Sequence, residues 1–125
     1  MNEIELPLLT FNSLYNLLRQ EKKTKTLQKL PELFYEAKDK FIVEKLKNIE
    51  KLKNNDDKEK LKKEKNLINS SEKIINELLS IRAIKIANIA IKNELFEEEI
   101  LSKNGIIKKE EEFLEVIKKA TKIFK

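Results

Sequence analysis

The stretch LINSSEKIINELLSIRAIKIANIAI, residues 67–91, carries the pattern that decides the fold. Up to position 81 its apolar residues recur every three or four positions, which is the spacing of one broad stripe along an α-helix. From residue 84 to 91 nearly every side of that helix is apolar, so we expect several neighbours to cover it. This run is too short to span a bilayer and contains Lys85 and Asn88, so we interpret it as buried helix.

Turn and capping signals divide the rest of the chain into helices. Thr10 is placed to cap a first helix, and Asp56 with Glu59 has the spacing of a capping box at the start of the third. The stretch SKNG, residues 102–105, is a stop signal with its glycine in the helix-terminating role. The predicted helices cover residues 11–23, 31–54, 56–93 and 107–124, with breaks near 24–30, 54–57 and 102–106. The predicted fold is an all-α, four-helix bundle-like domain with a long third helix, whose charged 56–66 portion we expect to project or fray.

The stretch LQKLPELFYEAKDKF, residues 27–41, places a proline and two adjacent aromatic residues at the start of the predicted second helix. Pro31 suits a first helical turn, where its missing N–H would be unpaired in any case. Phe34 is expected to face the core, while Tyr35, on the next side of the helix, can bury its ring at the edge and keep its hydroxyl in water. Pro31, Phe34 and Tyr35 are therefore our candidate structural anchors.

The composition indicates one helical domain and removes most catalytic chemistry. The chain has 125 residues, 40% of them hydrophobic and 39% charged, with one Gly and two Pro. It has no Cys and no His, so it lacks thiolate nucleophiles, the commonest general base and the commonest metal ligand. A single Gly cannot form a phosphate-binding loop. We expect no enzymatic activity, no catalytic residues and no cofactor.

Two runs of three glutamates are the remaining candidates for a metal site. They occupy residues 97–99 and 110–112, and no His accompanies either run. Consecutive helical residues point in different directions, so such a run does not converge on one ion. We interpret both runs as solvated acidic faces, with the second also placed to interact with the N-terminal dipole of the last helix. No metal ligands are predicted.

The net charge of +5 is unevenly distributed along the chain. Residues 19–29 hold five basic side chains and one acidic one, whereas residues 94–115 hold three basic and eight acidic ones. A basic nucleic-acid-binding module would use residues 19–29, together with Lys118, Lys119 and Lys122. Only two of the 27 basic residues are arginines, the usual residue for bidentate base and phosphate contacts. A lysine-rich solvated surface is the simpler interpretation.

Arg82 and Lys85 lie one turn apart where the third helix becomes apolar on nearly all sides. A charge there must reach water, pair with a carboxylate or contact a partner, and an ion pair within the chain and an intermolecular role are both open. Because a domain of this size struggles to cover the run at 84–91, we expect a dimer or larger assembly with Arg82, Lys85 and Ile89 at its interface. A generic helical adaptor or coiled-coil dimer would instead use residues 56–81, although a broad stripe favours a globular bundle.

The order of motifs resembles the helical domain of archaeal GINS subunits of the type in which the helical domain comes first. The motifs are LYNLLRQE, LPELFYEAKDKF, IRAIKIANIA and IIKKEEEFLEVI, with a long charged helix before the third. The matching residues are Glu21, Leu27, Leu30, Pro31, Phe34, Tyr35, Arg82, Lys85, Ile86 and Glu112, with Phe113 beside the last. The resemblance covers nearly the whole chain, and Leu-Pro-x-x-Phe-Tyr is its most specific part.

The resemblance implies a non-catalytic scaffold in DNA replication. GINS subunits pack through their helical domains and bridge the MCM helicase ring to a RecJ-like partner. The implied partners are therefore a related GINS subunit or a second copy of this chain, in a dimer or tetramer, together with MCM and a RecJ-like protein, without sequence-specific nucleic-acid or membrane contact. No positively charged leader precedes a continuous apolar core at the N-terminus, so the cytoplasm is the expected location by default, and the resemblance adds association with the nucleoid. Family members commonly carry a small β-rich domain after the helices, whereas residues 1–125 show only helical patterns, so we expect one GINS-like helical domain without it.

Overall fold

A computed structural model describes residues 5–96 and 105–125, and the regular elements in these ranges are all helical. They are α1 (Phe11–Lys23), α2 (Phe34–Lys53), α3 (Lys58–Leu95), α4 (Lys108–Thr121) and a short 3-10 helix, η2 (Lys122–Phe124). The predicted all-α fold with a long third helix is confirmed. Of the predicted stop signal at 102–105, the first three residues lie outside the described ranges.

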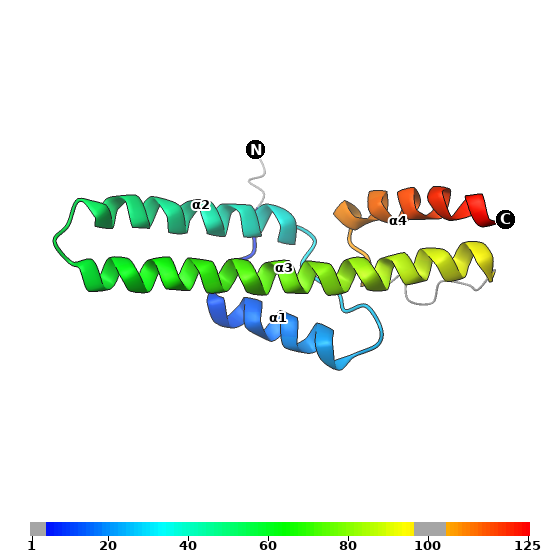
Figure 1. The fold of residues 1–125 in the computed structure, drawn as a ribbon, viewed down its shortest axis with the longest axis horizontal. Coiled ribbons are helices and arrows are strands. Elements are labelled where there is room, and N and C mark those ends of the chain that lie inside the picture. Colours follow the sequence, from blue (N-terminus) through cyan, green and yellow to red (C-terminus); the bar gives the residue numbers. More distant parts are fainter. Residues whose placement is uncertain (1–4, 97–104) are drawn as a thin grey trace.

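Helix α3 forms the axis of the molecule, and the other three helices lie along it (Figure 1). Helix α2 is antiparallel to the first half of α3, to which it is joined through residues 54–57. Helix α1 lies against the middle of α3, on the other side from α2, and α4 runs along the second half of α3 in the same direction (Figure 1). The closed end of the α2–α3 hairpin therefore extends past both α1 and α4.

Local side-chain chemistry sets the beginnings of two helices. The hydroxyl of Thr10 accepts a hydrogen bond from the backbone N–H of Ser13 at 3.0 Å, as expected for the predicted cap of α1, and Ser13 returns the interaction through its own hydroxyl. The prediction that Asp56 caps α3 was wrong by one position. Asp57 caps this helix, since its carboxylate accepts from the backbone N–H of Lys60 at 3.1 Å.

Helix α2 begins later than the sequence predicted. Pro31 is exposed and precedes the helix, and its carbonyl accepts a hydrogen bond from the N–H of Phe34 at 3.0 Å in a tight turn. Pro31 therefore starts the turn that leads into α2 instead of occupying the first helical turn. Phe34 is fully buried at the first position of the helix, in the place expected of an anchor.

The charged beginning of α3 does not fray. Residues 58–66 are helical and lie beside α2 in the hairpin (Figure 1), although this part of α3 does project past α1 and α4. The apolar stripe of α3 after residue 66 is buried against other helices of the same chain, because Ile75 and Leu78 pack in one core cluster with residues of α1 and α2. A zipper built on residues 56–81 would need that same face.

Two clusters of buried apolar side chains lie along α3. The first joins α1, α2 and the middle of α3 around Leu14, Leu18, Phe34, Ile75 and Leu78. The second joins the 24–33 connection, the end of α3 and α4 through Leu27, Ile86, Ala90 and Leu114. The run at 84–91 is only partly covered within the chain: Ile86 and Ala90 are buried, whereas Ile84 and Ile91 remain 63% and 36% exposed.

Candidate functional site: a buried ionic network

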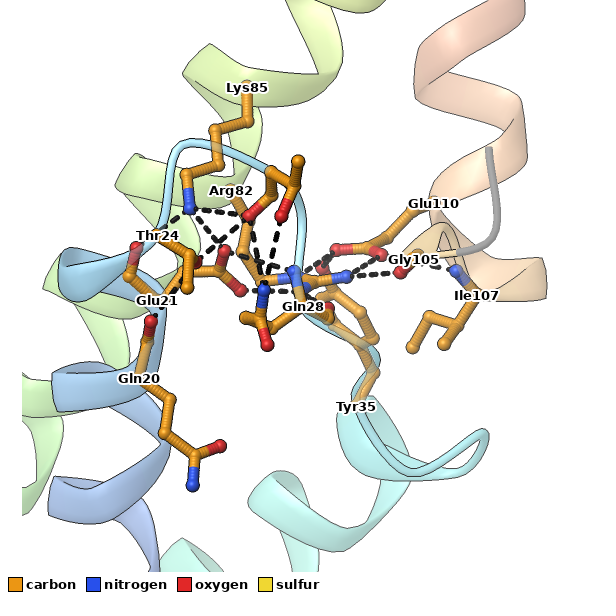
Figure 2. A network of polar contacts seen from close by, with 11 residues as sticks. Gln20, Glu21, Thr24, Gln28, Tyr35, Arg82, Lys85, Gly105, Ile107 and Glu110 are labelled. Carbon is orange, nitrogen blue, oxygen red and sulfur yellow. Dashed lines mark hydrogen bonds and ion pairs between the residues drawn. The ribbon is translucent and has the colours of Figure 1, made fainter. Parts of the chain in front are cut away.

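Arg82 lies near the middle of α3, fully buried between the two apolar clusters, and holds a network of polar contacts (Figure 2). A guanidinium group has five N–H donors, and the structure supplies an acceptor for each. The Nε donates to Glu110 Oε2 at 2.8 Å, Nη1 to Glu21 Oε1 at 2.7 Å and to the carbonyl of Gln28, and Nη2 to Glu110 Oε1 at 2.6 Å and to the carbonyl of Gly105 at 2.9 Å. Because every donor is occupied, this buried charge carries no unsatisfied hydrogen-bonding group.

Glu21 reaches the network from the last turns of α1. Its carboxylate accepts from Arg82 on one oxygen, and on the other from the Lys85 ammonium at 2.5 Å and the backbone N–H of Gln28 at 3.2 Å. Only 1% of Glu21 is exposed. The side chain thus links α1 both to α3 and to the connection that follows α1.

Glu110 reaches the network from the first turn of α4. Its carboxylate forms a two-point contact with Arg82, receives the hydroxyl hydrogen bond of Tyr35 at 2.9 Å, and accepts from the backbone N–H of Ile107 at 3.3 Å. The last contact satisfies one of the free N–H groups at the start of α4, and a negative charge is favoured at that end of a helix. Glu110 therefore anchors the start of α4 against α3 and α2 together.

Lys85 closes the network toward solvent, where 14% of its side chain is exposed. Its ammonium contacts the Glu21 carboxylate and donates to the carbonyls of Glu21 at 2.7 Å and Thr26 at 3.0 Å. The first carbonyl belongs to the last turn of α1 and the second to the segment beyond it. The two cations, Arg82 and Lys85, balance the two carboxylates, so the cluster has no net formal charge.

The network alters the ionisation of two of its members. Burial acts to lower the pKa of the Arg82 guanidinium, but the hydrogen bonds and charges of Glu110 and Glu21 outweigh it, so that pKa is raised and Arg82 stays protonated. Burial raises the pKa of the Tyr35 hydroxyl, and the charge of Glu110 and the hydrogen bond to it raise this pKa further. Tyr35 is therefore a hydrogen-bond donor throughout the physiological range.

Gly105 is needed because two backbone segments approach closely at this point. A Cβ placed on Gly105 would lie 2.9 Å from the carbonyl carbon of Leu27, inside van der Waals contact. The predicted reason for this glycine was helix termination, whereas its backbone does not lie in the left-handed region. The close approach brings the carbonyls of Gln28 and Gly105 to the same guanidinium.

Of the alternatives left open for Arg82 and Lys85, the structure contains the ion pair within the chain, since both residues pair with carboxylates of their own chain. The expectation of a water-exposed Tyr35 hydroxyl was wrong because Glu110 accepts its hydrogen bond. Glu110 itself was missed, since it was taken as part of a solvated face. Its position in the first turn of a helix was the available signal.

The other acidic positions differ from Glu110. Glu111 and Glu112 are exposed, and Glu110 is the residue of this run that contacts Arg82. The run at 97–99 lies outside the described residues. Ile89 is partly buried and packs against the second core cluster. Within the described ranges, no group of three or more acidic, Cys or His residues is arranged to hold a metal ion.

The arrangement holds side chains from distant parts of the sequence in fixed positions. Its side chains are a guanidinium with every N–H donor occupied, an ammonium, two carboxylates engaged by these cations, and a tyrosine held neutral. They come from all four helices (Figure 2): Arg82 of α3 contacts Glu21 of α1 and Glu110 of α4 directly, and Tyr35 of α2 joins through Glu110. Removing one partner of a buried ion pair is costly, because the other charge is left buried without compensation.

Comparisons with protein-family models, with curated proteins and with solved structures find no match for this chain. Among the described helices, none is long and apolar enough to cross a membrane.

Proposed function

We propose that this chain is a non-catalytic scaffold subunit that pairs through the second half of α3 with a copy of itself or with a related helical subunit. The observation that carries the proposal is a stripe of exposed residues, Ile84, Asn88, Ile91 and Leu95, three of them apolar. Their spacing of four, three and four positions places them on one side of the helix. We call this the α3 stripe.

The α3 stripe lies on a different side of the helix from the buried residues Ile86 and Ala90. Ile84 is 63% exposed and Leu95 is 39% exposed, so these side chains lack cover along about three turns of helix. Contiguous exposed apolar surface of this kind is typical of protein interfaces. The rigid placement of α3 by the ionic network would hold the stripe in a fixed orientation for a partner.

More particularly, we propose that the scaffold is a GINS-like subunit, which associates with the MCM helicase and a RecJ-like protein at the nucleoid. Support comes from where the residues of the resemblance lie. Glu21, Tyr35, Arg82 and Lys85 all belong to the ionic network. Leu27, Leu30, Phe34 and Ile86 are buried in the two core clusters on either side of it. Eight of the ten matched residues therefore form one packed unit, whereas Pro31 and Glu112 are exposed.

Sedimentation equilibrium at micromolar concentration tests the pairing. We expect the wild-type chain to form a dimer or larger assembly, and the double variant Ile84→Asp, Ile91→Asp to be a folded monomer. The matched control places two aspartates on exposed apolar positions of α2, Val43→Asp and Leu46→Asp, and should leave the assembly intact. A wild-type monomer, or equal loss of assembly in both double variants, would overturn the role of the α3 stripe.

Capture experiments test the particular assignment. Immobilised wild-type chain should retain purified archaeal MCM or a RecJ-like protein, and the Ile84→Asp, Ile91→Asp variant shows whether capture depends on pairing. An assembled chain that retains neither protein would remove the GINS-like proposal and leave a generic helical adaptor.

A further inference from the structure

The outer surface of residues 11–30, which comprise α1 and most of the connection after it, carries positive charge from its own side chains without negative charge, and the next carboxylate along the chain is the exposed Glu32. Residues 11–30 contain five basic side chains, all exposed, and a single acidic one, Glu21. Glu21 is buried and its two oxygens face Arg82 and Lys85 in the ionic network. The folding of the network therefore removes the only carboxylate of this segment from its surface.

Four of these five cations are available to a ligand. Lys22 pairs with Glu77 at 2.6 Å. The other four make no ion pair with the part of the chain that the structure describes; they are Arg19, Lys23, Lys25 and Lys29. Such a group of positive charges binds phosphates through counterion release.

An aromatic ring lies on α1, on the same side of the helix as Arg19 and Lys23. Tyr15 is 47% exposed on α1, and the guanidinium carbon of Arg19, one turn further along, lies 5.9 Å from the centre of its ring. Exposed amide side chains, Asn12, Asn16 and Gln20, occupy neighbouring positions of the helix. An exposed ring beside cations is the combination on which unpaired bases stack while their phosphates are neutralised.

We propose that this surface, formed by Tyr15, Arg19, Lys23, Lys25 and Lys29, binds single-stranded nucleic acid. The four cations contact the phosphates, and the ring of Tyr15 stacks on a base. A duplex keeps its bases stacked inside, so it can use the cations but not the ring. Lysine predominates over arginine here, which suits contact with the backbone and gives little sequence preference.

The proposal is independent of the proposed scaffold function, because it uses none of the residues of the α3 stripe. A chain that fails to pair can still bind nucleic acid, and a chain that pairs can fail to bind it. The two proposals are therefore separated by measuring assembly and nucleic-acid binding on the same variants.

Fluorescence anisotropy with labelled (dT)20, (rU)20 and a 20-base-pair duplex tests the inference. For four neutralised phosphates the logarithm of the binding constant should fall with the logarithm of salt concentration at a slope of about −3, which is a loss of about 50-fold between 50 and 200 mM salt. Both single strands should bind more tightly than the duplex, and the tighter of the two identifies the nucleic acid that fits best. Duplex binding equal to or tighter than single-strand binding would overturn the proposal, as would equal binding of a labelled polyglutamate.

Two charge-matched variants locate the surface. Arg19→Gln, Lys23→Gln, Lys25→Gln removes three of the four cations and should reduce the salt slope to about −1. The control Lys47→Gln, Lys62→Gln, Lys63→Gln removes the same charge from exposed positions of the α2–α3 hairpin and should keep the wild-type slope. Equal effects of the two variants would mean attraction by net charge alone and would overturn the site.

Substitution of the ring tests stacking. Tyr15→Ala should weaken single-strand binding by about fivefold or more, with no change for the duplex, because a stacked base contributes about 1 kcal/mol or more. Tyr15→Phe retains the ring and should bind like the wild type. Unchanged binding by Tyr15→Ala would remove the ring from the proposed site and overturn the preference for single strands.

Discussion

Replacement of Arg82 by methionine removes the centre of the ionic network while keeping an unbranched side chain of similar length. Glu21 would still contact Lys85, so its charge stays compensated. Glu110 would keep only neutral donors, the Tyr35 hydroxyl and a backbone N–H, and would be a buried carboxylate without a cation. Breaking a buried pair in this way costs about 3–5 kcal/mol, and we expect that loss in the free energy of unfolding. Since domains are stable by about 5–15 kcal/mol, the variant should be markedly weakened.

Lys85→Met is the matched comparison. It removes a cation that is partly exposed, and Glu21 would keep Arg82 as its partner, so we expect a loss of only about 1–2 kcal/mol. Urea titration followed by circular dichroism measures both variants, with an unchanged denaturant slope required for the comparison. Adding Glu110→Gln to Arg82→Met removes the uncompensated charge, and the double variant should be about 1–3 kcal/mol more stable than the sum of the single losses. A loss below about 1 kcal/mol for Arg82→Met, or equal losses for the two methionine variants, would refute the assignment of Arg82 as the centre.

Three further substitutions test neighbouring contacts by the same titration. Phe34→Ala should cost about 3–5 kcal/mol through lost burial and a residual cavity, and a loss near zero would contradict its role as an anchor. Gly105→Ala should cost about 1–3 kcal/mol because its Cβ meets the backbone of Leu27, and a stabilising effect would show that the two segments move apart easily. Tyr35→Phe should cost about 1–2 kcal/mol near neutral pH through the lost hydrogen bond to Glu110. Because the fold raises the pKa of Tyr35 above its ordinary value of 10.0, this contribution is complete below pH 10 and is lost as the pH rises above it. The stability difference between wild type and Tyr35→Phe should therefore shrink above pH 10, and a difference that grows there would contradict the sign of the shift.

The helices and their order were predictable because apolar periodicity and capping chemistry are local properties. The capping hydroxyl of Thr10 and the buried side chain of Phe34 follow from residues within one or two turns. The predicted starts of α3 and α2 were wrong because a second local signal lay close to the one we used. Asp57 replaced the adjacent Asp56 as a cap, and Pro31 entered a turn before the helix instead of the helix itself.

The candidate site was only half predictable because its partners are distant in the sequence. The position of Arg82 and Lys85 in an apolar run signalled that the two cations need a special environment. Their carboxylates, Glu21 and Glu110, come from other helices, and periodicity along one helix does not select a partner on another. The resemblance pointed to Glu21, but it placed the acidic residue of the last helix at Glu112.

The wide sequence spacing of the contacts around Arg82 has a consequence for the order in which the chain assembles. Arg82 is hydrogen-bonded to residues 61, 54 and 28 positions away in the sequence, whereas only residues 54–57 separate α2 from α3 along the chain. Closing long loops costs chain entropy before any contact is gained, so the α2–α3 hairpin should form early and the bonds to Arg82 late. Contacts that form after the transition state slow unfolding and leave the folding rate almost unchanged. The hydrogen bonds to Arg82 would then mainly lower the unfolding rate, and so set how long the folded chain persists once it has formed.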